Sequence, residues 1–174
     1  LLLLHNNQSS LLLHETAQDT FFKVPRKYDI IGQSGQLKQE GFVVMYHIPV
    51  NAEGQPVFEH AYKQHLIQIQ NQPGLYAFRF LKQIGSDSYI ILTQWQEENA
   101  FKAWQNNTSY QSAFDYEGVT SSSQKLFTGN AFNTPYSFGL TSTRNLIDAI
   151  TKKNPTNKPT KPIATVAVII HENI

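Results

Sequence analysis

Residues Gln72–Phe114 read QPGLYAFRFLKQIGSDSYIILTQWQEENAFKAWQNNTSYQSAF, and this stretch decides the fold. Two mainly apolar and aromatic segments, 75–83 and 88–95, are joined by a short turn that contains Gly85. Such a pair predicts a β-hairpin. Segment 97–106 follows directly, and its spacing predicts a helix whose apolar stripe is Ala100, Phe101 and Trp104. The stretch therefore predicts a sheet covered by helices, with room between them for a flat, hydrophobic ligand.

Both faces of the predicted hairpin carry apolar side chains. The first strand directs Tyr76, Phe78 and Phe80 to one face and Leu75, Ala77 and Leu81 to the other. The second strand likewise sets Tyr89 and Ile91 against Ile90 and Leu92. An antiparallel sheet with one wet face would alternate apolar and polar residues instead. We expect helices on one face and a second sheet on the other, supplied by a twin subunit of a homodimer or by the chain's own first forty residues.

The flanking segments complete a recognisable order. Gly41–Val50 predicts a strand, Pro56–Gln70 a helix and Asn130–Leu140 a last strand. In the first of these strands, Phe42, Val44, Tyr46 and Ile48 share one face, and Val43, Met45 and His47 share the other. The order β-α-β-β-α-β is the ferredoxin-like pattern. The expected fold class is α+β, a ferredoxin-like antiparallel sheet with helices on one face, plus an N-terminal extension.

The two ends of the chain differ from this central block. Residues 1–40 predict strands at Leu1–Leu4, Ser10–His14 and Asp19–Val24, then a short helical or turn segment over Pro25–Ile31. The chain starts without Met and inside an element, so we expect the 1–40 segment to be incomplete at its start. Residues 41–142 form the predicted ferredoxin-like domain. Residues 143–174 contain a basic, proline-rich linker and a strand at Ile163–Ile170, which we expect to dock as an edge strand on this or a neighbouring subunit.

Composition narrows the class of protein. A chain of 174 residues makes one domain or a domain with an appendage. It has no cysteine, which excludes disulfides and thiolate metal sites, and its net charge of +1 offers no field for nucleic acid. Aromatic residues make up 12%, which favours an aromatic-lined pocket. No apolar run approaches the roughly 20 residues of a membrane span. We therefore expect a cytoplasmic protein that binds neither nucleic acid nor membranes.

The motifs PGLYAFRFLK, SYIILTQW and AFKAWQNNTSYQSAF, in this order, resemble the antibiotic-biosynthesis-monooxygenase superfamily of dimeric α+β barrels. The resemblance runs from Leu1 to Ser142 and is closest to two-part members, the HmoB-like heme-degrading monooxygenases and the staphylococcal TRAP protein. It implies a heme pocket between helix and sheet, built on an Asn, a Trp and a His. Carried onto this chain, the Trp is Trp104, the Asn position holds Tyr46, and the His position holds Phe114.

These substitutions leave the chemistry open. A phenyl ring at position 114 cannot ligate iron, whereas Tyr46 either ligates it as a phenolate or is a core tyrosine whose hydroxyl meets a helix or backbone group. Trp104 either limits a pocket or packs in the core. Three functions follow: a heme-degrading monooxygenase with heme as ligand or substrate, a non-catalytic ligand-binding, regulatory or stress protein, and a cofactor-free oxygenase of an aromatic compound. Each implies a small hydrophobic or aromatic ligand. The sequence assigns no catalytic residue and no metal ligand.

Overall fold

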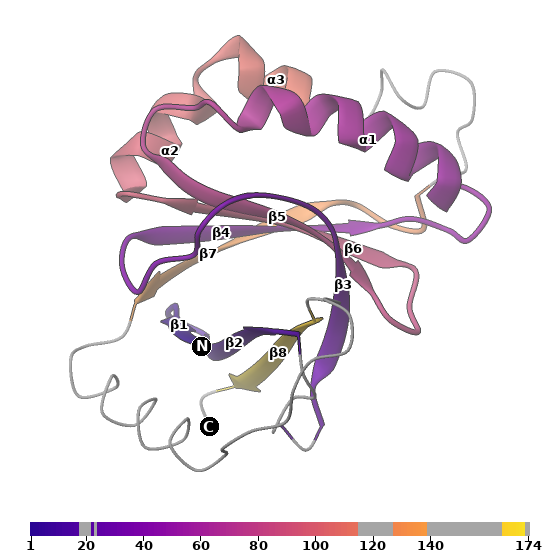
Figure 1. Ribbon diagram of the computed structural model, residues 1–174, viewed down its shortest axis with the longest axis horizontal. Coiled ribbons are helices and arrows are strands. Elements are labelled where there is room, and N and C mark those ends of the chain that lie inside the picture. The colour runs from indigo at the N-terminus through magenta and orange to yellow at the C-terminus, as the bar shows by residue number, and fades with distance from the viewer. Residues whose placement is uncertain (18–21, 23, 115–126, 139–164, 173–174) are drawn as a thin grey trace.

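The computed structural model describes residues 1–17, 22, 24–114, 127–138 and 165–172. In this part of the chain, strands curl into a closed barrel and helices lie across one side of it (Figure 1). The strands are β1 (Leu2–His5), β2 (Ser9–Thr16), β3 (Arg26–Gly35), β4 (Phe42–Pro49), β5 (Leu75–Gln83), β6 (Ser88–Trp95), β7 (Phe132–Phe138) and β8 (Thr165–Glu172). The helices are α1 (Gln55–Ile69), α2 (Glu98–Gln105) and α3 (Thr108–Phe114).

The ferredoxin-like order predicted from the sequence is confirmed. The predicted elements occur along the chain in the order β4, α1, β5, β6, α2 and β7. In the sheet, the strands lie in the order β5-β6-β4-β7, and every neighbouring pair is antiparallel. All three helices lie on the same face of this sheet (Figure 1). Helix α3 was not predicted. It begins where the Asn107 side-chain Oδ1 accepts a hydrogen bond from the backbone N–H of Ser109 at 3.0 Å, a local cap that satisfies a free helix-end donor.

Both faces of this sheet are buried, as the alternation predicted. On the helix side a cluster includes Tyr46, Phe80 and Ile91, packed beneath α1 and α2. Inside the barrel a second cluster includes Met45, Leu81 and Ile90. The neighbouring residues Met45 and Tyr46 thus enter different cores, because successive side chains of a strand point to opposite faces.

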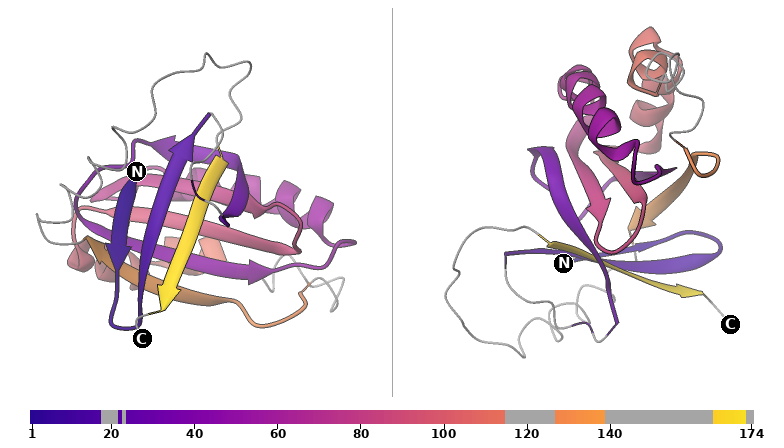
Figure 2. Two further views of the ribbon diagram at one scale, coloured as in Figure 1. Left: turned by 90° about the horizontal axis from the view of Figure 1, so that it is seen from below. Right: turned by 90° about the vertical axis from the view of Figure 1, so that its right-hand side faces the viewer.

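The same chain supplies the second sheet. β1, β2, β8 and β3 lie side by side, and this sheet joins β5 at one end and β7 at the other to close the barrel. Figure 2 shows these strands crossing beneath the helix-covered sheet. The first forty residues therefore supply three of the four strands that cover the inner face, as one of the two expectations had it, and the tail supplies the fourth, β8.

Two predictions in the first forty residues have different outcomes. Pro25–Ile31 is not helical or a turn, because β3 covers Arg26–Gly35 and pairs with both β8 and β5. The residues that hold it as a strand come from distant parts of the chain, so its local pattern was misleading. The predicted strand Asp19–Val24 falls largely outside the described residues, and Phe22 and Val24 are not in a strand.

The tail strand is confirmed, but its expected place at an edge is wrong. β8 covers Thr165–Glu172 and pairs with β2 on one side and β3 on the other. Its pairing with β2 is continuous, from Ser9 opposite Glu172 at one end to Thr16 opposite Thr165 at the other. β2 and β3 do not pair with each other, so each offers an open edge to β8. β8 is therefore an internal strand of the barrel, with a neighbouring strand on each side.

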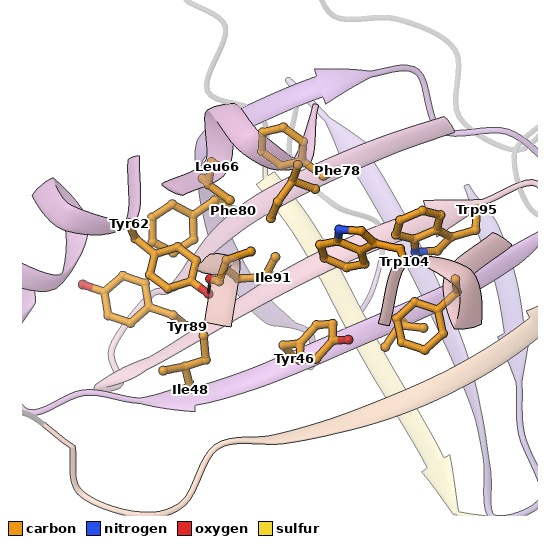
Figure 3. Packing of buried hydrophobic residues seen from close by; sticks show 14 of the residues in the cluster. Tyr46, Ile48, Tyr62, Leu66, Phe78, Phe80, Tyr89, Ile91, Trp95 and Trp104 are labelled. Carbon is orange, nitrogen blue, oxygen red and sulfur yellow. Dashed lines mark hydrogen bonds between the residues drawn. The ribbon is translucent and has the colours of Figure 1, made fainter. Parts of the chain in front are cut away.

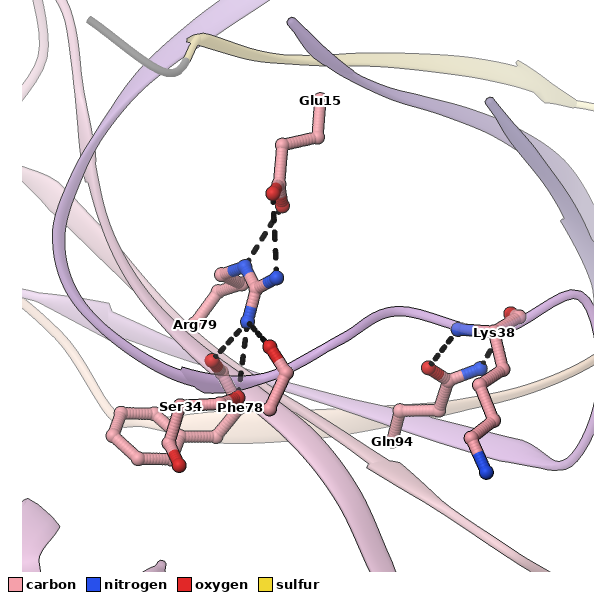
Figure 4. Close-up of polar contacts among 7 residues, drawn as sticks. Glu15, Ser34, Lys38, Phe78, Arg79 and Gln94 are labelled. Atoms are coloured by element: carbon pink, nitrogen blue, oxygen red, sulfur yellow. Dashed lines mark hydrogen bonds and ion pairs between the residues drawn. The ribbon is translucent and has the colours of Figure 1, made fainter. Parts of the chain in front are cut away.

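Two buried polar side chains brace the barrel (Figure 4). Arg79, on β5 and only 4% exposed, donates hydrogen bonds to both carboxylate oxygens of Glu15 on β2, at 2.8 and 3.2 Å. It also donates to the carbonyl oxygens of Ser34, Gly35 and Phe78. Gln94, on β6, exchanges hydrogen bonds with the backbone of Lys38. These contacts satisfy groups that would otherwise be costly to bury.

None of the helices in the described part of the chain is long and apolar enough to cross a membrane.

Candidate ligand site

Trp104 occupies the middle of an aromatic row beneath α2. Its indole is 3% exposed and lies between Trp95, at 5.0 Å between ring centroids, and Tyr110, whose ring meets it edge-on at 4.9 Å. Figure 3 shows Trp104 and Trp95 packed together above the sheet. The indole N–H donates a hydrogen bond to the Ser109 hydroxyl at 3.0 Å. Trp104 is therefore part of the core, with its polar atom already satisfied.

Tyr46 projects from β4 towards the helices and is 5% exposed. Its hydroxyl lies 3.1 Å from the hydroxyl of Tyr110, on α3. Tyr110 thus contacts both Tyr46 and Trp104, so two of the three residues singled out from the sequence meet through a third aromatic ring. Of the two interpretations of Tyr46, the observed contact corresponds to the core tyrosine with a helix partner.

Phe114 is the last residue of α3, and its side chain lies outside the described part of the structure. The residue before it is fixed: Ala113 is buried, and its carbonyl oxygen accepts a hydrogen bond from the Tyr62 hydroxyl at 2.8 Å. This bond joins the end of α3 to α1. The structure does not place the Phe114 ring relative to Tyr46 or Trp104.

A cavity of about 320 Å³ lies against Trp104, between the turn before β5 and the α2–α3 corner. Its described walls are Gln72, Pro73, Gly74, Gln96, Ala100, Ala103, Trp104 and Asn107. This cavity was not predicted from the sequence. The sequence feature that could have indicated the cavity is a glycine in the turn, Gly74, together with a small residue, Ala100, on the next helix.

Gly74 lets the turn and α2 come together at this cavity. Its φ of +78° is in the left-handed region, and a Cβ there would lie 2.6 Å from the Ala100 Cβ. Its carbonyl oxygen accepts a hydrogen bond from the Gln96 N–H at 2.7 Å. Only glycine combines that conformation with that approach at little cost. The cavity wall is therefore fixed by backbone geometry.

The strongest pKa perturbation in the helix-covered core lies at a group that does not line the cavity. The Tyr89 hydroxyl donates to the Glu59 carboxylate at 2.6 Å, and Lys82 donates to the same oxygen at 2.7 Å. Burial and the Glu59 carboxylate raise the pKa of Tyr89. Partial burial opposes ionisation of Glu59, but the hydrogen bonds from Lys82 and Tyr89 and the Lys82 charge hold its pKa below the usual value. This cluster fastens α1 to the sheet.

The side chains present do not fit heme as an iron-ligand site. No His, Cys, Met or Tyr stands among the eight described residues of the cavity wall, and these are the usual heme ligands. The same eight residues include no Lys, Arg or His to pair with the carboxylates of heme. Deeper in, the Trp104 indole packs against the aromatic rings of Trp95 and Tyr110, and the Tyr46 hydroxyl is hydrogen-bonded. Across the described residues, no three His, Cys, Asp or Glu side chains cluster as a metal ion requires.

Comparison with known proteins identifies relatives. Residues 41–116 match the family model described as antibiotic biosynthesis monooxygenase. A heme-degrading monooxygenase from Listeria monocytogenes is 28% identical over 131 residues, covering 67% of this chain and 77% of that protein.

Solved structures share the fold. A heme-degrading enzyme from Listeria monocytogenes superposes with a TM-score of 0.59 at 21% identity, covering 79% of this chain and 84% of that one. A structure of a major regulator of staphylococcal pathogenesis gives a TM-score of 0.58 at 17% identity, covering 73% of this chain and 84% of that one. At these identities the likeness concerns the fold alone.

Proposed function

Because residues 41–116 match the antibiotic biosynthesis monooxygenase family, we propose that the chain is a monooxygenase-like protein that binds a small, flat, mainly apolar compound beside Trp104 without turning over heme. The family and its heme-degrading relative support the monooxygenase-like part of this statement. The ligand, its site and the lack of heme turnover are the parts proposed from the geometry.

The cavity on Trp104 is the observation that carries the proposal. Half of its eight described wall residues have apolar side chains: Pro73, Ala100, Ala103 and Trp104. Small-molecule sites are typically apolar concavities of about 300–1,000 Å³, and this cavity lies at the lower end of that range. A compound of two or three fused rings suits that volume better than a tetrapyrrole does.

The chemistry of the wall favours binding over oxidation. A cofactor-free oxygenase must remove a proton from its substrate before the carbanion meets dioxygen, which requires a base within hydrogen-bond reach. None of the eight described wall residues has a titratable side chain, since amides, aliphatic groups and an indole cannot serve as a base. Non-catalytic ligand binding is therefore the function that the geometry supports best. Cofactor-free oxidation would need a base from outside these residues.

The test is calorimetric titration of the full chain with 2-naphthol, a neutral two-ring compound. We expect saturable binding to the wild type. Ala103→Phe should weaken it at least about tenfold because the new ring occupies the cavity. Ala52→Phe makes the same change at an exposed turn position away from the cavity and should bind as the wild type does. Lack of saturable binding, or equal binding by Ala103→Phe, would overturn the proposal.

A further inference from the structure

The rim of the Trp104 cavity consists of neutral amides. By rim we mean the polar residues of its wall, Gln72, Gln96 and Asn107, and no charged side chain stands among the described wall residues. From this rim we infer that the cavity selects neutral planar ligands that carry a hydroxyl or similar donor–acceptor group at the edge, and rejects anions of the same shape. The inference rests on the proposed ligand site and adds the chemical class of its ligand.

Asn107 presents a donor to the cavity. Its Oδ1 accepts hydrogen bonds from the Ser109 backbone N–H at 3.0 Å and from the Thr108 hydroxyl at 3.3 Å. These contacts fix the orientation of the amide, since only an oxygen can accept from the N–H at the start of α3. The Nδ2 group, with two N–H donors, is the part of Asn107 left to meet a ligand.

Gln72 presents the complementary acceptor. Its Nε2 donates to the carbonyl oxygen of Gln68, at the end of α1, at 2.8 Å. That bond uses one of the two Nε2 donors and identifies Oε1 as the atom that can accept from a ligand. A phenolic hydroxyl can accept a hydrogen bond from Nδ2 of Asn107 and donate one to Oε1 of Gln72. The rim therefore matches a group that does both.

The local charges disfavour an anion. Glu97 and Glu98 directly follow the wall residue Gln96 in sequence and are both exposed. The cation on α2 beside Ala103, Lys102, pairs with Glu98 at 2.9 Å. An anionic ligand would give up hydration on entering the cavity and would gain no opposing charge from its described wall. A neutral ligand loses much less.

The experiment compares 2-naphthol with naphthalene-2-sulfonate, which has the same rings and a fixed negative charge. The wild type should bind 2-naphthol at least about tenfold more tightly. Asn107→Asp keeps the acceptor that starts α3 but removes the donor and adds a negative charge. It should weaken 2-naphthol binding about three- to tenfold. Asn106→Asp adds the same charge at the adjacent exposed position, which does not line the cavity, and should bind as the wild type does.

A gain-of-binding variant completes the test. Gln96→Lys places a cation on the cavity wall and should raise the affinity for naphthalene-2-sulfonate about tenfold relative to the affinity for 2-naphthol. If both compounds bind equally well and Ala103→Phe weakens both, the site stands and the selection of neutral ligands is wrong. If neither compound binds, the proposed ligand site itself is wrong.

Discussion

The hydroxyl groups of Tyr46 and Tyr110 lie 3.1 Å apart and join the central strand β4 to helix α3. Tyr46 stands where the family resemblance implies the Asn of a heme pocket, and Tyr110 also packs edge-on against Trp104. The side chains of Tyr46, Tyr110 and Trp104, held together by these contacts, occupy this part of the space between helices and sheet. Trp104 also lines the outer cavity.

Removing the Tyr46 hydroxyl should destabilise the protein. Tyr46→Phe removes the part-buried hydrogen bond between the Tyr46 and Tyr110 hydroxyls, so the free energy of unfolding should fall by about 1 kcal/mol. The matched control is Tyr76→Phe, at a partly exposed tyrosine whose ring contacts Lys38. Urea unfolding measures both variants. Equal stability of the two variants would show that the tyrosine pair contributes nothing.

Two glycines with nearly the same backbone conformation separate strain from crowding. Gly85, at φ +77°, has open space where a Cβ would stand, so Gly85→Ala should cost about 1 kcal/mol from conformation alone. Gly74→Ala adds a clash with Ala100 and should cost about 2–4 kcal/mol. Gly74→Ala should also weaken 2-naphthol binding, whereas Gly85→Ala should not. Similar losses of stability in the two variants would contradict the close approach of turn and helix.

The Glu59 cluster predicts a pH dependence of stability. Because the folded-state pKa of Glu59 lies below its ordinary value of 4.5, its ionised form stabilises the fold above pH 4.5. This contribution is lost as the pH falls through the folded-state pKa. Glu59→Gln should lower the free energy of unfolding by about 1 kcal/mol at neutral pH, after allowance for solvent screening.

The difference between wild type and Glu59→Gln should shrink on acidification towards about pH 3. Glu53→Gln, at an exposed turn residue, is the control and should match the wild type throughout. Urea unfolding at a series of pH values gives these differences. A gap between wild type and Glu59→Gln that does not shrink at any point of the acid series would contradict a stabilising contribution from ionised Glu59.

Much of the fold could be predicted from the local sequence pattern. The parts that could not be predicted depend on partners that are distant in sequence. The face assignments of Met45 and Tyr46 were correct because strand alternation is local and both clusters are large. β3 was missed because it is held by β5 and β8, which are remote in sequence. The cavity was missed because its walls combine the turn at Gly74 with Asn107, residues that no periodicity connects.

The ion pair between Arg79 and Glu15 should stabilise the barrel. Glu15→Gln leaves a guanidinium that is 4% exposed without its carboxylate, so the free energy of unfolding should fall by about 2 kcal/mol. The exposed pair Lys102–Glu98 provides the control, and Glu98→Gln should change stability by less than about 0.5 kcal/mol. A negligible effect of Glu15→Gln would mean that the three carbonyl contacts of Arg79 suffice.

The central claim is that the ligand site of this monooxygenase-like chain is not an iron-ligating heme site. A titration of the purified protein with hemin, followed through the Soret band and then by addition of ascorbate under air, tests it most directly. We expect no saturable Soret shift and no reductant-dependent bleaching, while 2-naphthol still binds to the same preparation. A near-stoichiometric Soret shift that bleaches with ascorbate would contradict it and would establish heme turnover by this chain.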